Sequence, residues 1–220
     1  MAANTRHLIP RVAVASLASP LEVGADRAPK AAAELADSIE RAGCEVLRLG
    51  AVSNAEHAVA AGQHAVQWRA QSIAFAVASW FEDYLVTDLL EECAAPIVLW
   101  SLPGMETGAL CGTQQLTSLL KRLEAPYRCV FGPVDSASAL QATLDYIRAA
   151  ALKYRLRRAR VGLGGLPVRG MPDAVADWVA MKKTLGPRIV GIDLPELLQR
   201  AADMPVEQAR VAWQIGRAHV

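Results

Sequence analysis

Two carboxylates and three aromatic side chains lie together in one short stretch of the chain, SWFEDY at residues 79–84. A tryptophan ring can pack against the apolar C–H face of a sugar, and carboxylates can accept hydrogen bonds from sugar hydroxyl groups. Trp80, Glu82 and Asp83 are therefore candidate residues for binding a monosaccharide. The alternative is structural, with Trp80 and Phe81 filling the core and the two carboxylates capping the helix that follows.

Other residues that could bind a metal or act as a nucleophile lack suitable partners nearby in the sequence. His57 and His64 lie seven residues apart on one expected helix and can share a face, but no third metal ligand lies nearby in the sequence. Cys111 lies at an expected helix start, where a thiolate is favoured. Without a neighbouring histidine, we interpret it as a packing residue beneath the loop. The sequence assigns no catalytic residue and no metal ligand in this chain.

A glycine-rich segment in the second half of the chain is similar to a nucleotide-binding loop. Gly162, Gly164 and Gly165 are followed by Pro167, which occupies the position of the third glycine of GxGxxG, and no GK[ST] follows. The segment therefore matches neither the dinucleotide-binding loop nor the phosphate-binding P-loop. We expect a close turn from strand to helix, with Asp173 as a possible N-cap.

Five short apolar segments alternate with helical segments in the first part of the chain. The expected strands are residues 12–18, 45–49, 73–78, 97–100 and 128–131, and the expected helices are residues 30–42, 55–69, 85–93 and 112–123. This alternation predicts an α/β fold with a doubly wound parallel sheet of the flavodoxin or Rossmann-like type. Ligands bind at the carboxyl edge of such sheets, where the loop containing Trp80 is expected.

A long helix at residues 136–156 leads to a second region of strand and helix. It ends in a basic cluster formed by Lys153, Arg155, Arg157, Arg158 and Arg160. A nucleic-acid patch is one interpretation, but no binding motif accompanies the cluster, so a solvated linker helix is favoured. We place a domain boundary here, between an N-terminal domain at residues 1–150 and the start of a second α/β domain at residues 151–214.

The second region contains only two expected strands, at residues 161–163 and 189–192. One expected helix lies between them at residues 174–185, and others begin near residues 195 and 206. Two parallel strands cannot stand as an independent domain. The final hexapeptide IGRAHV, at residues 215–220, matches one reading frame of a common sequencing adapter. We interpret it as a non-native tail and expect that the natural chain continues.

Composition excludes several classes of protein. The 220 residues include 23 Lys and Arg against 22 Asp and Glu, and 53% are hydrophobic, which excludes a disordered or fibrous chain. A net charge of +1 gives no overall attraction to nucleic acid or to a membrane, so neither is expected as a partner. The uncharged run at residues 73–81 is too short to span a bilayer. Four cysteines without a CxxC pair fit a reducing cytoplasm.

Several segments resemble the L-fucose and L-arabinose isomerase family. The segment that begins VGLGG and ends LLQRA is similar to the opening of that family's second domain: a strand ending in glycines, a Gly-Met turn before an acidic residue, a Lys-Lys-x-x-Gly motif, and a strand followed by Asp and a Glu-Leu helix. Upstream, IVLWSLP, LCG and RLEAPYRCVFG resemble the later part of its first domain. The resemblance covers most of residues 70–214.

The resemblance implies two Rossmann-like domains followed by a β-rich domain, assembled into a homo-oligomer when full length. Members interconvert aldoses and ketoses through an ene-diol, with a divalent metal, usually manganese, whose ligands lie late in the second domain and in the third. It also implies that Trp80 and Arg27 contact the substrate. We therefore expect the N-terminal fragment of a sugar isomerase of carbohydrate metabolism, inactive alone and holding no metal itself. The alternative is a free-standing sugar-binding or regulatory module.

Overall fold

The computed structural model describes residues 9–165, 170–171 and 175–217, which form two compact units. The first unit runs from Ile9 to Leu152, and the second begins at Lys153. Each unit contains its own parallel sheet. Among the described residues, no helix has both the length and the apolar character that crossing a bilayer requires.

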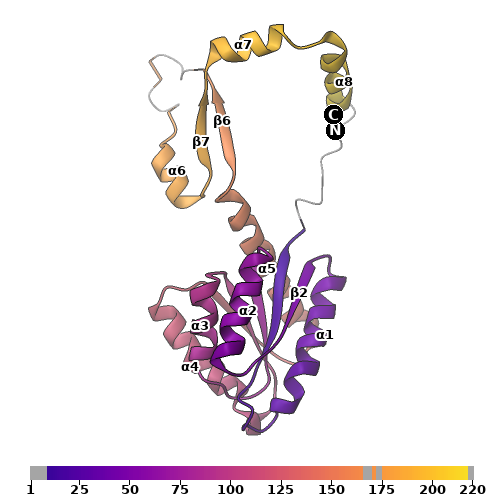
Figure 1. Ribbon diagram of the computed structural model, residues 1–220, viewed down its shortest axis with the longest axis vertical. Helices are drawn as coiled ribbons and strands as arrows, with labels where there is room; N and C mark the ends of the chain where they lie inside the picture. Colours follow the sequence, from indigo (N-terminus) through magenta and orange to yellow (C-terminus); the bar gives the residue numbers. More distant parts are fainter. Residues whose placement is uncertain (1–8, 166–169, 172–174, 218–220) are drawn as a thin grey trace. The chain divides into compact units, whose positions relative to one another are not determined.

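The first unit is built on a five-stranded parallel sheet with the order β2-β1-β3-β4-β5 (Figure 1). Its strands are β1 (Arg11–Leu17), β2 (Glu45–Val52), β3 (Ser72–Val77), β4 (Ile97–Ser101) and β5 (Tyr127–Phe131). Every residue of β3 and β4 is buried, which explains why these strands are apolar throughout instead of alternating.

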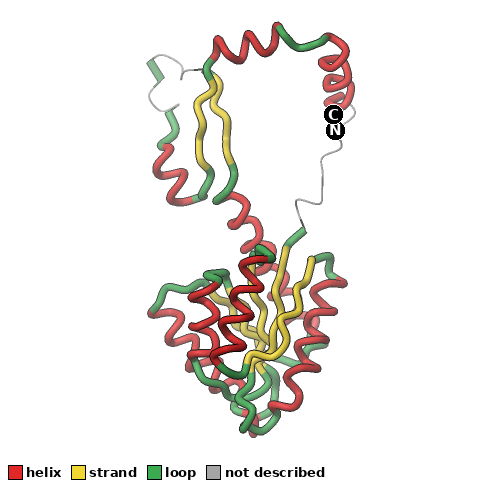
Figure 2. The backbone as a smooth tube through the Cα atoms, in the orientation of Figure 1, coloured by secondary structure: helices red, strands yellow, loops and turns green. Residues whose placement is uncertain are grey.

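Helices cover both faces of this sheet, as the tube drawing in Figure 2 shows. They are α1 (Ala28–Arg41), α2 (Ala55–Gln67), α3 (Tyr84–Glu92), α4 (Ala109–Arg122) and α5 (Ala137–Leu156). Buried side chains from α2, α3 and α4 pack on one face of the sheet, and those from α1 and α5 pack on the other. The predicted doubly wound α/β fold is therefore confirmed.

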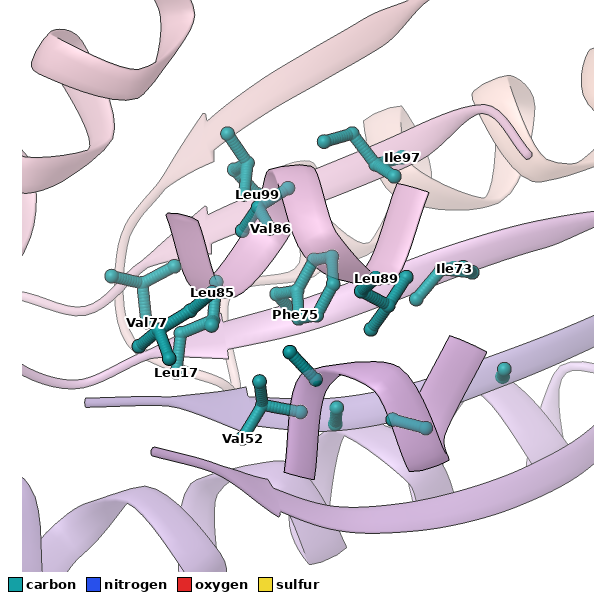
Figure 3. Close-up of a cluster of buried hydrophobic side chains, with 14 of the residues drawn as sticks. Leu17, Val52, Ile73, Phe75, Val77, Leu85, Val86, Leu89, Ile97 and Leu99 are labelled. Carbon is teal, nitrogen blue, oxygen red and sulfur yellow. The ribbon is translucent and has the colours of Figure 1, made fainter. Parts of the chain in front are cut away.

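The larger of the two cores lies beneath α2 and α3. Figure 3 shows Phe75 of β3 surrounded by aliphatic side chains from neighbouring strands and from α3, among them Leu89 and Leu99. All three side chains are fully buried. Burying side chains of this size stabilises the fold by roughly 1.5–3 kcal/mol each. The core on the opposite face includes four alanines of α1, which let that helix approach the strands closely, and the fully buried Trp100 of β4.

Short-range chemistry sets the ends of several helices. Asn54 is the N-cap of α2 and accepts a hydrogen bond from the His57 backbone N–H at 2.8 Å. Gly43 ends the turn after α1 with a φ of 89°, a conformation that favours glycine. Strand β2 continues to Val52, three residues beyond its predicted end. Its register with β1 shifts at Leu49, and pairing resumes at Gly50, which lies opposite Ala15.

The second unit contains a two-stranded parallel sheet of β6 (Arg160–Gly164) and β7 (Arg188–Ile192). Its helices are α6 (Trp178–Thr184), α7 (Leu194–Ala202) and α8 (Val206–Arg217). Apolar residues of both strands are exposed, as are Leu194 and Leu198 of α7. The side chains described in this unit beyond the end of α5 thus form no closed hydrophobic core.

Candidate functional site

The loops that follow β1, β3 and β4 emerge at the same edge of the first sheet, because the strands are parallel. Strand β1 pairs with β2 on one side and with β3 on the other, so the chain reverses its winding direction between β1 and β3. Ligands of doubly wound folds bind outside the carboxyl ends of strands at such a reversal. The loops at residues 18–27, 78–83 and 102–108 therefore form the candidate site.

Main-chain hydrogen bonds join these three loops around Trp80. The Trp80 carbonyl accepts from the Ser19 N–H at 3.0 Å, and the Trp80 N–H donates to the Thr107 carbonyl at 2.7 Å. The Ser79 hydroxyl also donates to the Trp80 carbonyl, at 2.9 Å. The backbone of residue 80 is consequently held between the loop after β1 and the loop after β4.

The first loop packs against the other two at Gly24. This residue has a φ of 87°, and a Cβ there would lie 2.7 Å from Thr107 Cγ2 and 3.2 Å from the Ala78 carbonyl oxygen. The short 3-10 helix η2 (Ala25–Arg27) follows directly. Only a glycine fits this point, and its lack of a side chain is what brings Arg27 close to the loop after β4.

Arg27 is exposed at this edge, as the resemblance implies for a ligand contact. One guanidinium nitrogen lies 3.1 Å from the position that a Cβ on Gly104 would take, and Glu106 Oε1 lies 3.3 Å from the same position. The Arg27 side chain makes no hydrogen bond or ion pair with another described residue. A cation and a carboxylate are thus available side by side for hydroxyl groups of a ligand.

Glu106 was not among the residues predicted from the sequence. It lies in the short 3-10 helix η3 (Met105–Thr107), within a stretch that the sequence suggests to be an irregular loop. Its position in the chain, just after a buried strand, is the signal that points to it. Its proximity to Arg27 depends on packing between two loops and has no signature in the sequence.

Trp80 has a half-buried side chain with a fixed orientation. Its indole Nε1–H donates to Gln115 Oε1 of α4 at 3.3 Å, and its Cβ lies 3.1 Å from the position of a Cβ on Gly108. The neighbouring Phe81 is fully buried in the core, so the structural interpretation is correct for that residue. The structure therefore brings Trp80 and Arg27 to one edge, with Gln115 as a partner that the sequence did not suggest.

Glu82 and Asp83 are half-buried at the start of α3. Asp83 occupies the N-cap position, but its side chain makes no capping hydrogen bond, and its Oδ1 is buried without a partner among the described residues. The interpretation of Asp83 as a side-chain cap is therefore wrong. No hydrogen bond described in the structure joins either carboxylate to Arg27 or Trp80, and the role of Glu82 and Asp83 in ligand binding stays a prediction.

A cavity of about 290 Å³ lies beside this site, between the loop after β4, the first turns of α4 and the end of β5. Its lining residues are Leu102, Gly104, Met105, Gly108, Leu110, Cys111, Gln114 and Phe131. Two of these lining residues also lie next to the site, because Gly104 is close to the Arg27 guanidinium and Gly108 is close to Trp80 Cβ. Cys111 is exposed and lines the cavity, so its interpretation as a packing residue beneath the loop is wrong.

Manganese, which the resemblance implies for the full-length protein, does not fit the described residues. They contain no group of three or more His, Cys, Asp or Glu side chains that could hold a metal ion. His57 and His64 are exposed on α2, and His57 Nδ1 lies 3.2 Å from the Ser53 hydroxyl.

The glycines of the second unit belong mainly to a strand. Gly162 and Gly164 lie in β6, and a Cβ on Gly162 would lie 2.6 Å from Ile192 Cδ1 of β7. Asp173 lies outside the described residues. Helix α6 begins four residues later than predicted, because Asp177 caps it by accepting from the Val179 and Ala180 N–H groups at 2.9 Å.

Comparison with known proteins adds no relative. No protein-family model matches the chain, and no curated protein matches it.

Proposed function

We propose that the first unit binds a monosaccharide at the carboxyl edge of its sheet, and that the chain is the N-terminal part of a metal-dependent aldose–ketose isomerase. The observation that supports binding is the convergence of Arg27, Glu106 and Trp80 at the reversal point of the sheet. The family resemblance supports the class of reaction. The four free thiols support a reducing cytoplasm as its location, and the resemblance supports a homo-oligomer.

In this proposal each residue has a distinct task. The half-buried indole of Trp80, oriented by Gln115, packs against the C–H face of the sugar ring. Arg27 donates hydrogen bonds to ring or hydroxyl oxygens, and Glu106 accepts hydrogen bonds from hydroxyl groups. These contacts bind and orient a substrate. The general base and the electrophile that a proton transfer between adjacent carbons requires are not supplied by these side chains.

Calorimetric titration of the purified chain with L-fucose and L-arabinose tests the binding. We expect millimolar to micromolar affinity, with a loss of about tenfold in Trp80→Ala, which removes a stacking contact worth about 1–1.5 kcal/mol. Trp213→Ala, which removes an exposed indole in the other unit, is the matched control and leaves the affinity unchanged. Equal affinities in all three proteins contradict the proposal.

The reaction is tested separately. A reconstructed full-length protein is expected to interconvert an aldose and its ketose only when supplied with a divalent metal, and the 220-residue chain is expected to convert neither. Isomerisation by the purified chain contradicts this part of the proposal. The two closed cores of the first unit favour the alternative, a free-standing binding module. That alternative predicts that the longest natural chain binds the sugar without isomerising it.

A further inference from the structure

The second unit gathers positive charge at one end of its sheet. Strands β6 and β7 are parallel, and their first residues, Arg160 and Arg188, are paired in register. Adjacent strands lie about 4.8 Å apart, so two guanidinium side chains start from neighbouring positions. Like charges placed opposite each other in a sheet are destabilising.

Two helix ends add to this charge. The Lys182 ammonium of α6 donates to the carbonyls of Arg157 and Gly186, at 3.2 and 2.7 Å. A Cβ on Gly186 would lie 2.8 Å from the Arg157 Cα, so the end of α6 lies directly against the chain that leaves α5. Arg157, Arg158, Arg160, Lys182, Lys183 and Arg188 form what we term the basic edge, and all six are exposed.

Negative charge is scarce around the basic edge. The described segments at residues 153–165 and 175–192 contain one acidic residue, Asp177, whose carboxylate accepts hydrogen bonds from the first N–H groups of α6. No ion pair among the described residues involves any member of the basic edge. The repulsion within the edge is therefore uncompensated by the described residues, and a polyanion would relieve it.

An aromatic contact within the edge favours nucleic acid over other polyanions. The Arg158 guanidinium lies flat over the Tyr154 ring, 3.6 Å from its centroid, and its Nη1 donates to the Tyr154 carbonyl at 3.3 Å. A guanidinium held in this way offers its outer face to a nucleobase. Four of the six cations are arginines, whose planar forks match phosphate oxygens.

We propose that the basic edge binds the phosphate backbone of single-stranded nucleic acid, without sequence preference. This reverses the interpretation of the cluster as a solvated linker helix, which rested on the lack of a nucleic-acid-binding motif in the sequence. Three of the cations, Lys182, Lys183 and Arg188, come from a distant part of the sequence and join the cluster only on folding.

Fluorescence anisotropy of a labelled oligothymidylate of about 20 nucleotides, titrated with the full chain, tests the proposal. Each phosphate contact steepens the dependence of log K on log salt by about 0.7 for single strands, so six contacts give a slope of about −4. The same relation predicts that Arg160→Gln with Arg188→Gln weakens binding about 25-fold at roughly 0.1 M salt and lowers the slope by about 1.4.

Two further variants make the result specific. Arg160→Lys with Arg188→Lys keeps the charge and is expected to retain binding within about threefold, which also excludes misfolding as the cause of the loss. Lys121→Gln with Arg122→Gln removes two exposed cations from α4 and is the matched control with the same change in net charge. Binding in this control is expected to equal that of the unaltered chain.

Several outcomes would overturn the proposal. One is the absence of oligonucleotide binding at about 50 mM salt, and another is an equal loss of affinity in the Arg160/Arg188 and Lys121/Arg122 glutamine variants. Binding to phosphatidylserine vesicles without binding to the oligonucleotide would assign the edge to a lipid surface instead. Salt-sensitive self-association that is abolished by Arg160→Gln with Arg188→Gln, again without oligonucleotide binding, would assign it to a second copy.

Discussion

Single glycines position the candidate site, because they set how closely its loops approach. Gly24→Ala places a methyl group 2.7 Å from Thr107 Cγ2 in a backbone conformation that alanine rarely adopts. We expect a loss of about 2–4 kcal/mol in the free energy of unfolding, which combines the left-handed backbone cost with steric overlap. Urea denaturation monitored by circular dichroism measures it.

Gly43→Ala is the matched control for this substitution. Gly43 has a similar φ of 89°, but a Cβ there meets nothing within 4 Å. Only the backbone cost remains, about 1–2 kcal/mol. Equal losses in the two variants would show that the loops of the site are not tightly packed at Gly24.

The half-buried phenol of Tyr146 predicts sensitivity to alkali. Burial raises the pKa of Tyr146 from 10.0 to about 12. Below pH 10 the phenol is neutral in both states, so stability is unaffected there. Between pH 10 and about 12 the unfolded chain releases the proton first, so the free energy of unfolding falls, by about 1 kcal/mol because solvent screens this half-exposed group. Tyr146→Phe is expected to flatten this part of the pH profile, and an unchanged profile would contradict the assignment.

Helices α2 and α3 approach each other closely at Gly62. A Cβ on Gly62 would lie 2.6 Å from Glu92 Cβ and 2.7 Å from the Leu89 carbonyl oxygen. Alanine favours a helix by about 1 kcal/mol over glycine, yet we expect Gly62→Ala to destabilise by about 1–2 kcal/mol because the helices must separate. Thermal unfolding shows whether the substitution lowers or raises the melting temperature. A rise would contradict the expected close packing of the two helices.

The elements themselves were largely predictable, because their signals are local. Apolar runs marked every strand of the first sheet, and Gly43 marked the end of α1. Helix α6 was predicted to begin too early because Asp173 suggested an N-cap there, whereas the helix begins after Asp177, whose side chain caps it. Trp80 was predicted from its acidic and aromatic neighbours and its place after a strand, and Arg27 was predicted from the family resemblance. Gln115 and the cavity depend on contacts between distant segments.

At the scale of the whole molecule, the two units differ in how much apolar surface they bury. The first unit has two closed cores, whereas Leu198 of α7 is 62% exposed and Val179 of α6 is 77% exposed. Protease cleavage of a folded chain requires local opening, which costs least where few apolar contacts must be broken. The second unit is therefore expected to be the more easily digested.

Limited trypsin digestion followed by mass spectrometry tests this expectation. The first cuts are expected beyond Leu152, at sites such as Lys153 and Lys183, and they leave a resistant fragment that contains β1 to β5. Cleavage after Arg48 or Arg69, within the first unit, serves as the internal comparison. If those sites are cut as fast as the C-terminal ones, the difference in stability between the units is refuted.

The hydrogen bonds that hold residue 80 are all made to its main chain, apart from the one that its indole donates. Every amino acid except proline offers the same N–H and carbonyl groups. The side chain at this position can therefore be exchanged while the loops around it keep their shape. A scaffold with this property is well suited to acquiring new ligand preferences by single substitutions, in nature or in the laboratory.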